Sequence, residues 1–255
     1  NIFLTSIALS ILLGSFLSIL GPINQSYRIN KGINITGKSR RSVKKELLTR
    51  KSNLLSLYND KLENFERLEK LINKWENHII KNPGLDVSAF FISLDDQVYA
   101  EIKSDIKLSA ASSIKVPILI ILLRMLEKEE IIWNEKLILS EDVIGGGSGW
   151  MAYQEIGEIF PVYEVASEMI RVSDNTATNL LIKRLGGIKI VNQKFKEIGL
   201  NNTQINNYLP DLDGTNLTST KDLSLAMALV DNGYLLNVSS RDIFREIMSK
   251  SKTNT

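Results

Sequence analysis

The sequence predicts an α/β protein of the α+β type, in which a short antiparallel sheet packs against many helices. Two runs rich in β-branched and aromatic residues, 87–92 and 98–102, flank the polar turn Asp95-Asp96-Gln97, as expected of a β-hairpin. After this hairpin, apolar residues recur at helical spacing and are separated by glycine-rich and polar breaks. A strand pair followed by a run of helices is typical of helices packed on an antiparallel sheet.

The composition excludes several kinds of chemistry. The 255 residues include no cysteine and one histidine, His78, which we interpret as a partly exposed helix residue. Disulfides, thiol catalysis, cysteine-ligated zinc and histidine-rich metal sites are therefore excluded. The formal charge of +2, with 44% hydrophobic and 24% charged residues, is ordinary for a globular protein. We expect no metal, no cofactor and no nucleic-acid partner.

The first residues form a strongly apolar stretch. Residues 2–20 carry no charged side chain, and Gly21-Pro22 ends the stretch. A helix of this length spans roughly 30 Å, the thickness of a bilayer core. Because no clear small-x-small cleavage site follows, we interpret residues 1–22 as an uncleaved membrane signal anchor, with a buried soluble helix as the alternative. The chain starts with Asn rather than Met, so we expect its true N-terminus to lie further upstream.

A basic linker, residues 23–52, follows the predicted anchor. Its positive charges are opposed only by Glu46, and they are Arg28, Lys31, Lys38, Arg40, Arg41, Lys44, Lys45, Arg50 and Lys51. Such a segment is attracted to anionic lipid headgroups. Positive charge beside an anchor also favours the cytoplasmic side, so the topology stays open. We expect the domain at 53–255 to be periplasmic or otherwise extracytoplasmic.

The domain is predicted to begin with one long amphipathic helix. From Leu54 to Ile79 the apolar residues are spaced by three or four positions throughout. Asn82-Pro83-Gly84 ends this pattern before the predicted hairpin.

Residues 110–123 predict a buried helix that starts near Ser112. Pro117 lies early in the apolar run, where a missing backbone N–H costs least. Ser112 and Lys115 are three positions apart, so both lie on one face of the first turn. A serine hydroxyl is a weak nucleophile, and a lysine in a dry pocket can lose its proton and accept the proton of the serine. The pair alone also fits an N-cap beside a solvated lysine. The same spacing occurs, without a long apolar helix behind it, at Ser42/Lys45, Ser104/Lys107 and Ser249/Lys252.

Further helices alternate with loops toward the C-terminus. The helices are expected at 162–170, 177–185, 188–198, 221–236 and 241–248. Residues 131–143 are expected to be helical or irregular. The glycine run at 145–149 does not follow a strand and lacks a terminal Gly-Lys-Ser/Thr, so we interpret it as a mobile loop at the mouth of a cleft rather than a phosphate loop.

Ser112-x-x-Lys115, then a glycine loop, a helix and Ser173-Asp174-Asn175, resembles the serine β-lactamase and penicillin-binding protein superfamily, closest to its class A β-lactamase-like branch. The resemblance covers residues 54–248 and implies a β-lactamase/transpeptidase-like fold, with an antiparallel sheet flanked by helices and an all-helical subdomain. It implies that Ser112 attacks an acyl carbonyl, with Lys115 as the acylation base or its proton relay. Ser173 would pass a proton to the leaving nitrogen. Asn175 would bind the substrate amide and position Lys115, and Asp174 would hold the turn.

The sequence departs from the family in two places. Counted without gaps from Ser173, Leu209 stands where class A β-lactamases carry the deacylating glutamate, and Asp211 and Asp213 are nearby but offset. The third motif, Lys-Thr-Gly or Lys-Ser-Gly on a strand, is absent, and the hairpin supplies two of about five expected strands, too few to support a large helical layer. We therefore expect the chain to be a fragment with an incomplete sheet.

Three functions are compatible with these features. The first is a β-lactamase-type serine hydrolase that opens β-lactam amides through an acyl-enzyme. The second is a penicillin-binding D,D-peptidase-like enzyme that acts on peptidoglycan peptides and releases β-lactams slowly. The third is a non-catalytic binding protein of the cell envelope.

Overall fold

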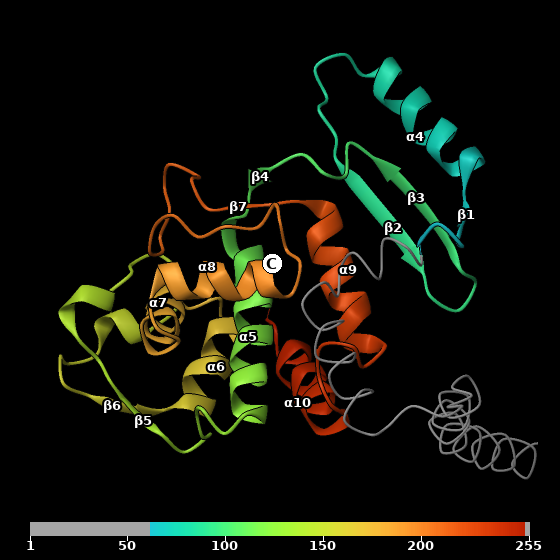
Figure 1. Ribbon diagram of the computed structural model, residues 1–255. Coiled ribbons are helices and arrows are strands. Elements are labelled where there is room, and N and C mark those ends of the chain that lie inside the picture. The colour runs from blue at the N-terminus through green and yellow to red at the C-terminus, as the bar shows by residue number, and fades with distance from the viewer. Residues whose placement is uncertain (1–61, 253–255) are drawn as a thin grey trace, which may run out of the picture. The chain divides into compact units, whose positions relative to one another are not determined.

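The structure is a computed structural model that describes residues 62–252 (Figure 1). The strands are β1 (Glu66–Arg67), β2 (Ala89–Ser93), β3 (Val98–Ile102), β4 (Leu108–Ser109), β5 (Lys136–Ile138), β6 (Ile159–Pro161) and β7 (Leu217–Thr218). The helices are α4 (Glu69–Lys81), α5 (Lys115–Glu127), α6 (Val162–Arg171), α7 (Asn175–Arg184), α8 (Ile188–Glu197), α9 (Thr220–Asp231) and α10 (Val238–Ser249). Short 3₁₀ turns are η2 (Ala111–Ile114), η3 (Glu141–Val143) and η4 (Met151–Tyr153).

The predicted anchor at 1–22 and the linker at 23–52 lie outside the described residues. Between residues 62 and 252, none of the helices combines the length and the apolar character that a bilayer crossing requires.

The predicted hairpin is present, and a third strand joins it. β2 and β3 pair antiparallel with Phe91 opposite Ala100, and β1 pairs parallel with the other edge of β3. The prediction of one continuous helix from Leu54 to Ile79 is therefore wrong around residues 65–68. The open edge of β3 offers backbone partners there: Glu66 N–H donates to Gln97 O at 2.9 Å, and Leu68 N–H donates to Tyr99 O at 2.8 Å. Edge pairing overrides the helical spacing, and α4 starts only at Glu69.

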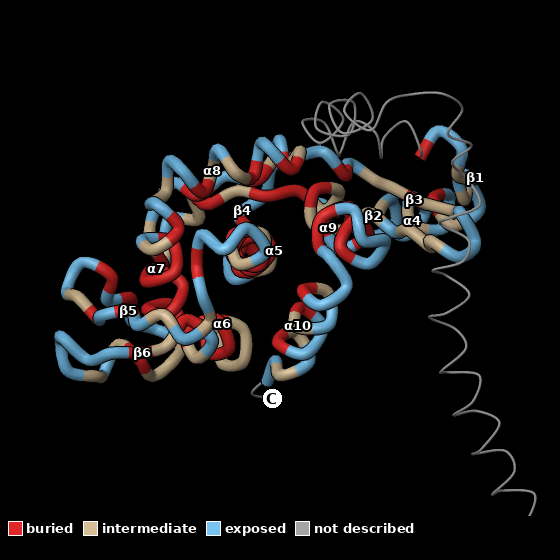
Figure 2. The backbone as a smooth tube through the Cα atoms, turned by 60° about the horizontal axis from the view of Figure 1, so that its bottom comes forward, coloured by how far each residue is buried: buried red, intermediate tan, exposed pale blue. Residues whose placement is uncertain are grey.

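The helical core is built around α5. Residues 116–123 of this helix are all apolar, and those from Ile118 to Leu123 are at most 1% exposed. Helices α6, α7, α8, α9 and α10 all contact it. Figure 2 shows α5 end-on with these helices grouped about it. Each such aliphatic side chain stabilises the fold by about 1.5–3 kcal/mol on burial. A central helix of this kind holds its first turn in a fixed place.

Two short strand pairs replace irregular structure. The region 131–143, expected to be helical or irregular, contains β5, which pairs antiparallel with β6 and buries Leu137 opposite Phe160. A strand of three residues is too short to show a clear alternation in the sequence. β4 pairs with β7, and Ala110 N–H donates to Asn216 O at 2.7 Å. This second pair fixes the chain immediately before the helix that carries Ser112.

The later helices lie where the spacing predicts them, with differences at their ends. α7 starts at Asn175 rather than at residue 177, and α10 starts at Val238 rather than at residue 241, because the side chains of Asp174 and Asn237 cap these earlier first turns. α9 ends at Asp231 rather than at residue 236, because Gly233 adopts a left-handed φ of 73° and Tyr234 N–H turns back to Leu229 O. Leu235 and Leu236 are nevertheless buried, which explains why the apolar pattern continues past the end of the helix.

Candidate active site

The first turn before α5 presents Ser112 and Lys115 on one face, as predicted. Ser112 lies in η2, which runs directly into α5, and Lys115 is the first residue of that helix. Lys115 Nζ lies 3.3 Å from Ser112 Oγ. Ser112 is exposed, whereas Lys115 is only 2% exposed. A ligand can therefore reach the hydroxyl while the amine stays away from bulk water.

The turn between α6 and α7 brings Ser173 to this pair. Ser173 has a left-handed φ of 57°. Its Oγ lies 2.8 Å from Lys115 Nζ and donates to Ser112 Oγ at 2.8 Å. Residues far apart in the sequence thus form a continuous chain of two hydroxyls and one amine.

Asp174 holds this turn, as expected from its place between Ser173 and Asn175. It is fully buried, and its Oδ1 accepts the Ala177 N–H at 2.9 Å, which caps α7. Its Oδ2 accepts the N–H groups of Trp150 and Met151 at 2.7 and 2.9 Å. Asp174 therefore joins the glycine loop to the start of α7 and does not contact the amine directly.

The surroundings of Lys115 Nζ suit an amine that gives and takes protons. Two pure acceptors contact it, Ser173 O at 2.5 Å and Asn175 Oδ1 at 3.0 Å. Asn175 Nδ2 donates to Gly146 O at 2.9 Å, so its Oδ1 must face the lysine. The two acceptors bind two amine protons in either charge state, and the remaining position faces the two hydroxyls. A neutral Lys115 can thus direct its lone pair at a serine.

Because Lys115 is buried, a substantial fraction of its amine is neutral near physiological pH. Desolvation lowers the pKa of Lys115 to about 8, while the charge of Asp174 raises it in part. An ordinary exposed lysine titrates above pH 10, so it is almost always charged at neutral pH. Lys115 differs from a solvated surface lysine for this physical reason.

Hydrogen bonds join the glycine loop, which its composition predicts to be mobile, to the start of α7. Asn175 N–H donates to Ser148 O at 3.1 Å. Gly149 has a φ of 97°, and a Cβ there would lie 2.1 Å from the carboxyl group of Asp174. The position needs glycine because the chain approaches the carboxylate so closely.

The loop after Gln204 has a leucine, Leu209, at the position where the family has its glutamate. Leu209 is 6% exposed, and both of its backbone groups bind Asn179: Leu209 N–H donates to Oδ1 at 2.8 Å, and Nδ2 donates to Leu209 O at 2.7 Å. Asp211 accepts Thr215 Oγ1–H and Asn216 N–H. Burial acts to raise the pKa of Asp211, but these hydrogen bonds lower it below its usual value. Asp211 is thus committed to its own loop.

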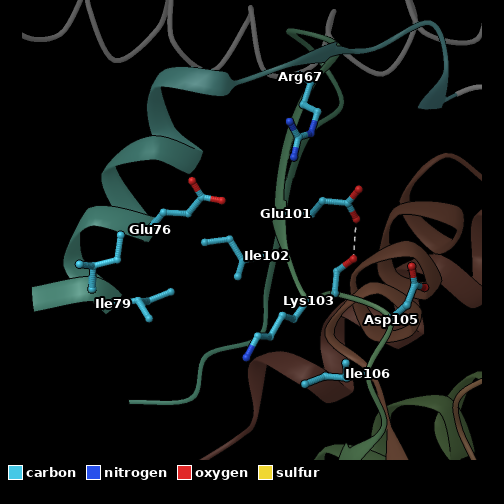
Figure 3. A pocket seen from close by; sticks show the side chains of 10 residues that line it. Arg67, Glu76, Ile79, Glu101, Ile102, Lys103, Asp105 and Ile106 are labelled. Carbon is cyan, nitrogen blue, oxygen red and sulfur yellow. Dashed lines mark hydrogen bonds between the residues drawn. The ribbon is translucent and has the colours of Figure 1, made fainter. Parts of the chain in front are cut away.

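A hollow of about 790 Å³, lined by other residues, lies between α4 and β3 (Figure 3). Several of its charged side chains are paired: Arg67 contacts Glu69, and Lys103 Nζ donates to Asp86 Oδ1 at 2.6 Å. Ser104 donates to Glu101 at 2.5 Å rather than facing a lysine. Within residues 62–252, no group of three or more His, Cys, Asp or Glu side chains could hold a metal ion. The described chemistry therefore points to the Ser112 site.

The structure brings together all four residues singled out from the sequence, Ser112, Lys115, Ser173 and Asn175. Sequence reasoning missed Asn179, whose two hydrogen bonds fix the backbone of Leu209. Asn179 lies four positions after Asn175, on the same face of one helix, and this spacing was the available signal.

Comparisons with known proteins agree with this geometry. The model of the β-lactamase enzyme family matches residues 67–255. β-Lactamase BRO-1 of Moraxella catarrhalis is 29% identical over 160 residues, which cover 61% of this chain and 48% of that protein. β-Lactamase ROB-1 of Haemophilus influenzae is 35% identical over 83 residues, covering 32% of this chain and 27% of its own. The chain spans half or less of the length of these curated relatives.

Solved structures show the same fold. PBP-A is 37% identical, with a TM-score of 0.72 over 74% of this chain and 72% of that one. Its L158E mutant, described as an acyl-enzyme complex with penicillin G, matches equally well. An ancestral class A β-lactamase, 18% identical with a TM-score of 0.64 over 71% of this chain and 72% of that one, shares the fold. The architecture expected from the sequence is confirmed, and the chain belongs to the β-lactamase enzyme family.

Proposed function

We propose that this protein is a serine hydrolase of the β-lactamase type, which opens β-lactam amides through a covalent ester on Ser112. One observation carries the proposal: an exposed Ser112 hydroxyl contacts both Ser173 Oγ and a buried Lys115 amine. The single histidine of the chain, His78, is far from Ser112 in the sequence. Lysine is therefore the base that the site offers. The L158E mutant of PBP-A, a structural relative, is described as an acyl-enzyme complex with penicillin G.

The acyl transfer can be written with every proton assigned. Ser112 Oγ forms a bond to the carbonyl carbon of the lactam, and neutral Lys115 takes the hydroxyl proton over 3.3 Å. The carbon–nitrogen bond then breaks. Ser173 gives its proton to the leaving nitrogen and regains one from Lys115 over 2.8 Å. The products are a serine ester and a secondary amine, and Lys115 returns to its neutral form.

Asn175 has two roles in this proposal. Its Oδ1 accepts a proton of Lys115 at 3.0 Å and so fixes the direction of the amine. We assign the substrate amide to the same residue, as the family resemblance implies. The Gly146 carbonyl keeps the Asn175 side chain in this orientation.

A slower enzyme of the D,D-peptidase type is the second candidate, and a specific observation favours it. Leu209 is apolar and buried where a deacylating glutamate would stand, and Asp211 is bound within its own loop. Without a base near the ester, an attacking water is not activated. We therefore expect acylation by β-lactams to be followed by slow release.

The test is mass spectrometry of the full-length protein after incubation with penicillin. We expect one adduct, mapped to Ser112 and absent from Ser112→Ala. Ser249→Ala is a matched control, because Ser249 has the same spacing to Lys252 but donates to Glu246 O instead. An adduct on another residue, or none, rejects the proposal and favours the non-catalytic envelope protein. An ester lasting hours indicates the peptidase type, and one lasting seconds or less a true β-lactamase.

We also propose that residues 1–22 anchor the protein in a membrane, with the catalytic domain on the extracytoplasmic side. The support is the uncharged apolar run at residues 2–20. Fractionation of cells, followed by protease treatment of intact spheroplasts, tests both parts. Recovery in the soluble fraction rejects the anchor, and protection from protease rejects the topology.

A further inference from the structure

A second buried carboxylate borders the Ser173 turn. Glu168 lies near the end of α6 and is 8% exposed. Its Oε1 accepts Arg171 Nε–H at 2.7 Å, and its Oε2 accepts Arg171 Nη2–H at 2.5 Å. Oε2 also accepts the indole Nε1–H of Trp150 at 2.6 Å. The proposed acyl transfer uses none of these three side chains.

These hydrogen bonds close a ring around the turn. The main-chain oxygen of Glu168 accepts the Asp174 N–H at 3.2 Å. Asp174 Oδ2 accepts the Trp150 N–H at 2.7 Å. The indole Nε1–H of Trp150 donates to the Glu168 carboxylate, which closes the ring. Each member of the ring is held at two points, and Ser173 comes directly before one of them.

Ser173 needs this support because its conformation is unfavourable by itself. A residue with a Cβ rarely adopts a φ of 57° unless its surroundings impose it. The Ser173 hydroxyl must also lie 2.8 Å from both Lys115 Nζ and Ser112 Oγ. Proton transfer depends on such distances, so a small displacement of the turn would interrupt the relay.

Glu168 is ionised in this setting. Burial acts to raise its pKa, but hydrogen bonds from Arg171 and Trp150 and the charges of Arg171 and Lys252 lower the pKa below its usual value. A carboxylate can accept the Arg171 fork and the indole together. The ring of Trp150 packs edge-on against Phe160, with centroids 5.9 Å apart, which fixes the indole in place.

We propose that Glu168 is a positioning residue of the acyl-transfer site, which acts with Trp150 to hold Ser173 between Ser112 and Lys115. Its catalytic consequence rests on the proposed function, whereas its effect on Lys115 does not. Arg171 completes the arrangement by neutralising the carboxylate.

Two variants test the proposal, each with a matched control. Glu168→Gln removes the charge that binds Arg171 and the indole. Glu135→Gln is its control, because Glu135 accepts a similar fork from Arg184 and has no hydrogen bond to the Ser173 turn. Trp150→Phe removes the indole donor and keeps an aromatic side chain at this position. Its control is Trp133→Phe, because Trp133 packs edge-on against Tyr163 at 5.6 Å, as Trp150 does against Phe160.

Two readouts separate positioning from mere stability. The first is the titration of Lys115 followed by NMR on labelled lysine, which needs no substrate. We expect the midpoint to rise from about 8 in Glu168→Gln and Trp150→Phe, because a loosened turn admits water to the amine. The second is the acylation rate with penicillin, which we expect to fall by about tenfold to a hundredfold. Both control variants keep the wild-type titration and rate.

The outcomes decide between the explanations. If Glu168→Gln and Trp150→Phe lower the melting temperature but leave the Lys115 titration unchanged, the positioning role is rejected. If Glu168→Gln does not fold, Trp150→Phe decides alone, since it keeps an aromatic side chain beside Phe160. If the titration moves in the variants but the wild-type protein is never acylated, the proposed function fails while the positioning role stands.

Discussion

Acylation of Ser112 should rise steeply with pH below pH 8, because only a neutral Lys115 can take the serine proton. Burial lowers the pKa of Lys115 to about 8. About half of the molecules then carry a neutral amine at pH 8, and about one in a hundred at pH 6. We expect the second-order acylation rate to increase about 50-fold between these two pH values. Stopped-flow measurements with a chromogenic penicillin at constant ionic strength give this rate directly.

The lowered pKa of Lys115 also predicts that the stability of the protein without substrate depends on pH. The pKa of Lys115 is 10.5 for the ordinary side chain and about 8 in the folded protein. Between these values the unfolded chain binds more protons than the folded one, so stability rises as the pH increases through this window. The full rise is about 3 kcal/mol. Urea unfolding of the wild type and of Lys115→Met, compared from pH 7 to pH 10, isolates this term.

One control variant and two possible results test the predicted pH dependence of acylation and of stability. Lys183→Met removes an exposed lysine that binds Asp142, and we expect it to keep the wild-type slope. An acylation rate that is flat from pH 6 to pH 8 contradicts a lysine base with a lowered pKa. An equal pH dependence of stability in the wild type and in Lys115→Met contradicts the burial argument itself.

Three further predictions concern the surroundings of the site. Leu209→Glu should shorten the acyl-enzyme lifetime at least tenfold by supplying a base for water; an unchanged rate of product release counts against this role for position 209. Asn179→Ala leaves both backbone groups of Leu209 without their Asn179 partner, and it should lower the free energy of unfolding in urea by about 1–3 kcal/mol. A decrease smaller than the error of the fit would contradict a stabilising role for these two hydrogen bonds. Gly149→Ala places a Cβ 2.1 Å from the Asp174 carboxyl group, so we expect a lower melting temperature and slower acylation; unchanged values of both would show that the loop can move away.

The four candidate site residues could be singled out from the sequence because their arrangement is partly local. The spacing of Ser112 and Lys115 places both on one helical turn, and the structure gives 3.3 Å between their reactive atoms. Ser173 and Asn175 follow from a motif whose turn is held by Asp174, a residue whose structural role was also expected. Their meeting with Lys115 depends on the packing of α7 against α5, which the sequence alone did not show.

The parts that sequence reasoning missed depend on tertiary contacts. β1 forms because the edge of β3 offers hydrogen-bond partners to Glu66 and Leu68, although the local apolar spacing is helical. The strands β5 and β6 are three residues each, so no alternation is visible before they pair. Glu168 is an ordinary helix glutamate in the sequence. Only the folded chain brings Trp150 to it and makes it part of the Ser173 turn.

The most direct measurement is a crystal structure of the protein after it has reacted with penicillin. We predict continuous electron density from Ser112 Oγ to the carbonyl carbon of the opened lactam, with Lys115 Nζ still hydrogen-bonded to Ser173 Oγ. An unmodified Ser112, in crystals whose protein carries penicillin covalently at another residue, would contradict the account.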